Sequence, residues 1–68
     1  MKTINLELLN KKRVVIFVDH ITEIHYDNDN YVVVVLDTGK EYTVTQSMDE
    51  IIALISKLYI EKRRQLWQ

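Results

Sequence analysis

The sequence predicts an α+β fold, in which an antiparallel sheet, a meander of about five short strands, is followed by one C-terminal amphipathic helix. Three observations lead to this class. Segments rich in β-branched residues recur through residues 3–45, clusters of turn-forming residues separate them, and from Ser47 onward apolar residues recur every three or four positions. The 68 residues contain no repeat and no Pro-rich or Gly-rich linker, so we expect a single α+β domain over residues 1–68.

The expected strands are of two kinds. Residues 3–8 and 41–45 alternate polar and apolar side chains, as strands with one buried face do. Residues 13–18 and 31–36 are apolar on both faces, which is typical of strands covered on both sides. A weaker strand is expected over residues 21–26. Together these segments form the sheet.

Turn signals punctuate the strands. Residues 10–12 are expected to form the first turn, and residues 27–30, all Asp or Asn, form a hairpin loop of residues that tolerate left-handed geometry and cap their own turns. Gly39 is the chain's one glycine and lies where a tight hairpin needs a positive φ. The order of strands and turns therefore favours antiparallel hairpins.

The helix begins with a capping box. The hydroxyl of Ser47 is expected to accept from the Glu50 amide, and the Glu50 carboxylate from the Ser47 amide. One apolar stripe then follows at helical spacing: Met48, Ile51, Ile52, Ile55, Leu58 and Tyr59. A helix over residues 47–67 would span about 30 Å, against about 20 Å for a six-residue strand, so its last turns overhang the sheet. Leu66 and Trp67 would then either reach a neighbouring molecule or fray.

Composition excludes several classes of protein. Without cysteine there is no disulfide framework, no thiolate nucleophile and no Cys-ligated zinc. The longest apolar run, residues 31–36, is far shorter than the roughly 18 residues of a membrane helix, so we expect no membrane partner. Charges lie where the apolar core of a signal peptide would be, which favours the cytoplasm.

No motif predicts catalysis or a cofactor. His20 and His25 have carboxylates nearby, but they lack a third imidazole or a thiolate, so we expect no metal site. The loop that starts at Asp27 opens like a calcium loop, yet it has Val32 where that loop needs glycine. Ser47 serves the helix cap, and no glycine-rich oxyanion or phosphate loop is present. We therefore predict a protein that is not an enzyme.

Self-association is the first functional prediction. One helix covers one face of one sheet, so the strands with two apolar faces leave a second face that needs a partner. A domain this small also has little core of its own. We expect a non-catalytic interaction module that forms a homodimer, or that binds an unidentified protein. The interface candidates are Val15, Phe17, Val32, Val34, Leu66 and Trp67.

A nucleic-acid-binding regulator is the alternative. Two basic triplets would contact phosphates, Lys11, Lys12 and Arg13 in the first turn and Lys62, Arg63 and Arg64 near the end of the helix, while Trp67 would stack on a base. Against this, the pI is about 6.0 and the middle of the chain is acidic. Cations at a helix end also complement its dipole. Nucleic acid is therefore the less favoured partner.

The whole layout is similar to the small FlbD-type flagellar and swarming-motility proteins of bacteria. The resemblance rests on Asn10 and Lys11 in the first turn, Ile21 and Ile24 in the third strand, residues 38–44 in the second hairpin and residues 47–52 at the start of the helix. It implies a short one-domain α+β chain with a basic C-terminal tail and a role in motility. This chain has Asn10-Lys11 where the family usually has Asn-Gly.

A weaker resemblance covers the middle of the chain. Residues 30–36, the Gly39-Lys40 turn and the start of the helix are similar to the core of LytTR-type DNA-binding domains. Those domains continue into further strands that carry the DNA contacts. The resemblance therefore implies a shared sheet-and-helix core and no DNA-binding residue in this chain.

Overall fold

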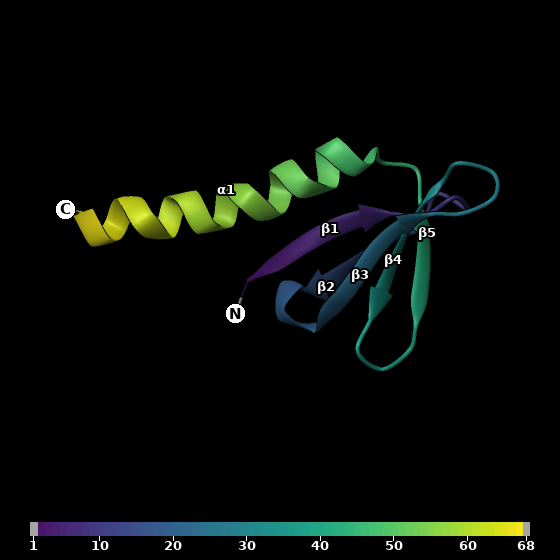
Figure 1. Cartoon of the computed structure of the whole chain (residues 1–68), viewed down its shortest axis with the longest axis horizontal. Helices are drawn as coiled ribbons and strands as arrows, with labels where there is room; N and C mark the ends of the chain where they lie inside the picture. The colour runs from purple at the N-terminus through teal and green to yellow at the C-terminus, as the bar shows by residue number, and fades with distance from the viewer. Residues whose placement is uncertain (1, 68) are drawn as a thin grey trace.

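The fold is an α+β arrangement of two small antiparallel sheets and one long helix (Figure 1). The structure, a computed structural model, describes the backbone of residues 2–67 and the side chains of residues 2–59. In chain order the elements are β1 (Thr3–Glu7), β2 (Arg13–Phe17), the 3₁₀ turn η1 (Val18–His20), β3 (Ile21–Tyr26), β4 (Val32–Leu36), β5 (Glu41–Val44) and α1 (Met48–Trp67). The predicted fold class is confirmed, and the strand ends differ from the predicted ones by at most one residue.

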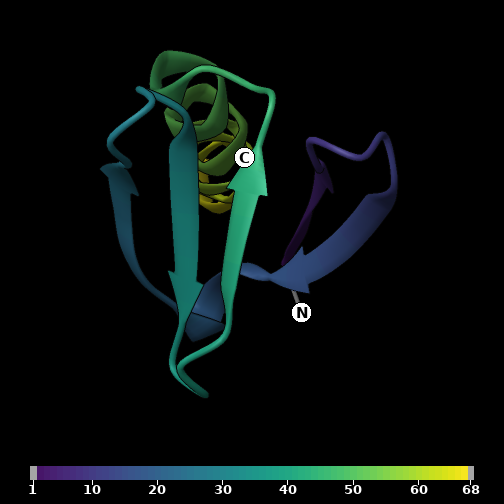
Figure 2. The same ribbon diagram turned by 90° about the vertical axis from the view of Figure 1, so that its right-hand side faces the viewer.

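The strands are divided between two sheets, where the sequence predicted one meander. β1 pairs only with β2, and β4 lies between β3 and β5, all antiparallel. The chain turns through η1 after β2, so β2 and β3 do not pair. At the far end a bridge between Leu8 and Val44 joins the sheets, and the Thr45 amide donates to the Glu7 carbonyl at 2.9 Å. The β1–β2 hairpin therefore stands apart from the three-stranded sheet (Figure 2).

The core lies between the hairpin, the three-stranded sheet and the first turns of α1. Alternate residues of β1 point inward, and so do alternate residues of β2 and β4, because successive side chains of a strand face opposite sides. The buried core residues among those described are Ile4, Leu6, Ile16, Val18, Val32, Val34, Val44 and Ile51. All are aliphatic, so the burial of apolar surface is the main stabilising term.

All three predicted turns are present. Asp27 Oδ1 accepts from the amides of Asp29 and Tyr31, both at 2.9 Å, and Asn30 has φ 66°. Gly39 has φ 89°, as the hairpin between β4 and β5 requires. The first turn holds a residue that the sequence analysis did not single out for positive φ: Lys11, with φ 68°. It occupies the position where the resembling family usually has glycine, a residue that adopts this conformation without strain.

Helix α1 begins at the predicted cap and extends past the strands. The Glu50 amide donates to Ser47 Oγ at 3.1 Å, which confirms the forward half of the capping box. The second half of the helix runs beyond the start of β1 (Figure 1). Ile51 is fully buried and Ile52 on the same predicted stripe is exposed, so only part of the stripe packs on the strands.

Candidate functional site

The central strand β4 belongs to the interior of the molecule. Val32 and Val34, two of the predicted interface residues, face the core, and no part of the Val34 side chain is exposed (0%). Val33, on the opposite face, is only 4% exposed and lies between His25 of β3 and Thr43 of β5 in the strand register. Val32 and Val34 are thus covered by the chain itself, and a partner that met them would have to displace the chain's own core.

The outward side of β2 is the exposed apolar strand face. Val15 is 63% exposed and Phe17 is 46% exposed, while Ile16 between them is buried. Arg13, at the start of the strand, is exposed on the same side as Val15 and Phe17. We call the side chains of Arg13, Val15 and Phe17 the β2 surface. Two of the predicted interface residues therefore form one continuous surface.

A cleft adjoins the β2 surface. It has a volume of about 240 Å³ and lies between β2 and the hairpin that joins β4 to β5. Its walls are mostly apolar, and its rim carries a histidine and an aspartate; the lining residues are Val15, Ile16, Phe17, His20, Leu36, Asp37, Thr38 and Tyr42. An apolar cleft beside exposed Val and Phe side chains suits contact with another apolar surface better than chemistry on a small substrate.

An ion pair holds the rim of this cleft together. His20 Nδ1 lies 2.8 Å from Asp37 Oδ2, and the Asp37 amide donates to the His20 carbonyl, also at 2.8 Å. The Phe17 ring meets the His20 ring edge to face, with 6.2 Å between centroids. The hydrogen bond that the His20 ring donates to Asp37 and the charge of the Asp37 carboxylate raise the pKa of His20 above its usual value of 6.5. The pair thereby links the end of β2 to the β4–β5 hairpin.

The His20–Asp37 pair predicts a small pH dependence. Because the pKa of His20 is higher in the folded chain, the pair's contribution to stability is fully present below pH 6.5 and is lost as pH rises through the raised pKa. An NMR titration of the His20 ring should show this elevated pKa, and Asp37→Asn should return it toward 6.5. An unchanged pKa in the Asn variant would show that Asp37 does not cause the shift.

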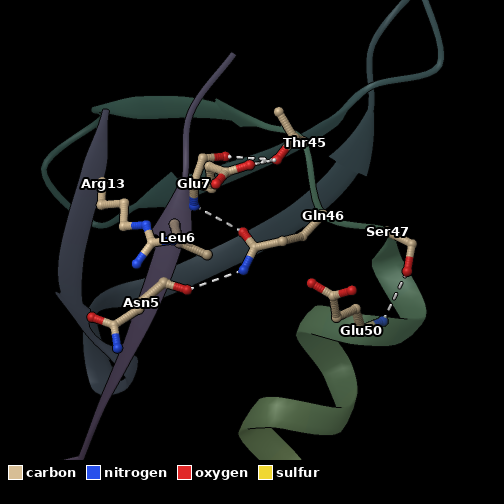
Figure 3. A pocket seen from close by; sticks show the side chains of 8 residues that line it. All are labelled: Asn5, Leu6, Glu7, Arg13, Thr45, Gln46, Ser47 and Glu50. Atoms are coloured by element: carbon tan, nitrogen blue, oxygen red, sulfur yellow. Dashed lines mark hydrogen bonds between the residues drawn. The ribbon is translucent and has the colours of Figure 1, made fainter. Parts of the chain in front are cut away.

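A second hollow lies between β1 and the start of α1 (Figure 3). It has a volume of about 550 Å³, and two of its lining side chains, Thr45 and Gln46, are hydrogen-bonded to β1. Gln46 Oε1 accepts from the Glu7 amide at 3.0 Å, and Gln46 Nε2 donates to the Asn5 carbonyl at 3.1 Å. Thr45 Oγ1 donates to Glu7 Oε1 at 2.9 Å. The side chain of Gln46 therefore pairs with the edge of β1 as a neighbouring strand would. These hydrogen bonds join β1 to the segment that precedes α1.

The first basic triplet forms an exposed turn. Lys11, Lys12 and Arg13 all lie on the surface at the end of the β1–β2 hairpin. The second triplet, Lys62, Arg63 and Arg64, and the interface candidates Leu66 and Trp67 lie outside the residues whose side chains are described.

The described part of the chain shows no constellation for metal chemistry and no helix for a membrane. His25 Nδ1 lies 2.6 Å from Glu23 Oε2, but within residues 2–59 no three His, Cys, Asp or Glu side chains gather closely enough to hold a metal ion. No helix in the described chain is long and apolar enough to cross a bilayer.

Sequence reasoning missed the far wall of the cleft. Leu36 and Tyr42 meet β2 only because the β4–β5 hairpin folds back beside it, and His20 and Asp37 are 17 residues apart. No local pattern marks such a contact, since periodicity reports only which residues share a face of their own strand. Gln46 had no signal either, because its partners are backbone groups of a distant strand.

Comparison with known proteins gives one clear result. A family model described as "Flagellar and Swarming motility proteins", FlbD, matches residues 3–62 of the chain. The match spans β1 through most of α1 and agrees with the resemblance found in the sequence. No curated protein and no solved structure matches the chain.

Proposed function

This chain belongs to the FlbD family of flagellar and swarming motility proteins, and we propose that it acts there without catalysis, as a protein–protein interaction module that forms a homodimer. The β2 surface is the interface in this proposal. A cytoplasmic site of action, expected from the sequence, is part of it.

The exposure of Val15 and Phe17 carries the proposal. A strand with apolar side chains on both faces is ordinarily covered on both sides, and β4 meets that rule within the chain. β2 does not, because Val15 is 63% exposed and Phe17 46% exposed. Burying both side chains against a partner would stabilise a complex by roughly 25 cal/mol for each Å² of apolar surface removed from water.

The size of the domain adds support. A chain of 68 residues without disulfides has a small core, and folding alone yields about 3–5 kcal/mol for domains of this size. Association adds stability by mass action, since it favours the folded state that can bind. A homodimer supplies such a partner without any second gene product.

Mass in solution tests the homodimer. Light scattering on a size-exclusion column should give twice the 8.1 kDa of the chain at low salt and also at high salt, because the apolar contacts of Val15 and Phe17 are not screened. Val15→Asp and Phe17→Asp should each give a folded monomer. Tyr31→Asp is the matched control, since Tyr31 is also exposed (45%) but lies on the β3–β4 loop, and this variant should remain a dimer.

Two outcomes would contradict the proposal. A wild-type chain that remains a monomer up to millimolar concentration would overturn the homodimer, and variants of Val15 and Phe17 that remain dimers would overturn the interface. Binding of nucleic acid that falls steeply with salt, and that is lost on replacing Lys11, Lys12 and Arg13, would instead support the alternative function.

A further inference from the structure

The β2 surface borders an unpaired strand edge. Within residues 2–67, β2 pairs only with β1. At the ends of this pairing the Val18 amide donates to the Lys2 carbonyl and the Leu8 amide donates to the Lys12 carbonyl, so even-numbered residues of the β2 segment face β1. In an antiparallel pair alternate residues bond to opposite sides. The backbone N–H and C=O groups of Arg13, Val15 and Phe17 therefore point toward the free edge.

This edge lacks the features that usually block strand pairing. Edge strands are commonly protected by bulges, proline or charged side chains in mid-strand. The other sheet has two edge strands: β3 has a register shift between Ile21 and Glu23 and carries the Glu23 carboxylate within the strand, and β5 is bridged to Leu8 at Val44. β2 pairs with β1 in unbroken register, and its one charge, Arg13, lies at its end. Beside β2 lies the cleft that it forms with the β4–β5 hairpin, and none of these blocking features is present in β2 itself.

The charges at the two ends of β2 are opposite in sign, which suits antiparallel pairing with a second copy of the chain. The turn before β2 is basic, with Lys11, Lys12 and Arg13, and the turn after it carries Asp19. When two β2 strands lie antiparallel and overlap over their whole length, Val15 faces the partner's Val15 and Arg13 faces the partner's Phe17. The basic turn of one copy and the η1 segment of the other, which carries Asp19, then lie at the same end of the paired strands, so opposite charges are near each other at both ends.

We infer that two copies of the chain join edge to edge through antiparallel β2 strands, with the two-fold axis at Val15, into one sheet of order β1-β2-β2-β1. The inference rests on the proposed homodimer and adds its geometry. Val15 of each copy donates its N–H to the partner's Val15 carbonyl, and Arg13 pairs with the partner's Phe17 along the backbone. Such isologous pairing closes the assembly at two copies, because each β2 has only one free edge.

Single cysteines test the register, since the chain has none of its own. Hydrogen-bonded antiparallel partners lie about 5.5 Å apart between Cα atoms, within disulfide range. Val15→Cys should therefore form a disulfide-linked dimer on oxidation with copper phenanthroline in air. Phe17→Cys should not, because the two copies of this residue are about 13 Å apart along the strands. A mixture of Arg13→Cys and Phe17→Cys chains should cross-link only between unlike chains.

Two substitutions of Val15 distinguish the contribution of backbone hydrogen bonds to the dimer from that of side-chain packing. Val15→Pro removes the outward-pointing N–H and fixes φ, whereas Val15→Ala keeps the N–H and shortens the side chain. Edge pairing predicts that Val15→Pro weakens the dimer by about tenfold or more beyond Val15→Ala, because both bonds of the central pair are lost. Both variants should keep the circular dichroism spectrum of the folded chain, since the outward N–H takes no part in the pairing with β1.

The outcomes distinguish the two proposals. A wild-type monomer by light scattering would overturn the homodimer itself. A wild-type dimer in which Phe17→Cys links to itself as readily as Val15→Cys, or in which the Pro and Ala variants weaken association equally, would keep the homodimer and overturn the edge pairing.

Discussion

Val34→Asp should leave the protein unfolded at 25 °C. Val34 is fully buried in the core, on the face of β4 that meets the hairpin and α1, and the core residues around it are aliphatic. A carboxylate there has no hydrogen-bonding partner, and burying it costs several kcal/mol in addition to the lost apolar contacts. This loss exceeds the roughly 3–5 kcal/mol of stability expected for so small a domain. Far-UV circular dichroism and thermal melting would measure it.

Val15→Asp is the matched control for this substitution. It makes the same chemical change in the other strand with two apolar faces, but at a side chain that is 63% exposed. The variant should retain a folded spectrum and a cooperative melting transition while it loses the proposed dimer. If Val34→Asp melted within a few degrees of the wild type, the assignment of β4 to the interior would be wrong.

Leu6→Ala should be the next most damaging change. The Leu6 side chain is fully buried between the hairpin and the rest of the core. Truncating a buried leucine to alanine lowers the free energy of unfolding by about 2–5 kcal/mol, because transfer energy is lost and a cavity remains. Urea denaturation followed by circular dichroism would show the loss as a lower midpoint.

Leu9→Ala supplies the comparison for Leu6. Leu9 lies in the turn after β1 and is 44% exposed, so its truncation should change the free energy of unfolding by no more than about 0.5 kcal/mol. Equal losses at the two positions would mean that the inward face of β1 is not the one assigned to it.

The local elements of this protein were predictable because their causes are local. Backbone geometry sets the two-residue period of a strand, so the alternation in residues 3–8 predicted β1 and its inward residues correctly. The Asp27 loop and the Ser47 cap depend on hydrogen bonds within a few residues of each other; the loop formed as expected, and so did the forward half of the capping box. Lys11 was not predicted to have a positive φ, because the hairpin connection imposes this conformation on a residue that does not favour it.

The candidate site was only half predictable. Val15 and Phe17 were chosen from the sequence together with Val32 and Val34, because residues 13–18 and 31–36 carry the same apolar pattern. The structure separates the pairs: the first is exposed and the second is buried. The other wall of the cleft, formed by Leu36 and Tyr42, could not be predicted from the sequence either, because only the folded hairpin brings it beside β2.

By itself, the sequence determined the α+β class, the strands, their turns and the start of the helix, since each depends on the chemistry of neighbouring residues. Only the tertiary structure decided which apolar strand keeps a free face. One face of β4 packs into the core through Val32 and Val34, and on its other face Val33 lies between His25 and Thr43 of the neighbouring strands and is only 4% exposed. β2 has one neighbour, and the turn through η1 leads the chain away from its other edge. The pattern of side chains shows which faces of a strand are apolar. The position of the strand in the folded chain determines which of these faces stays exposed.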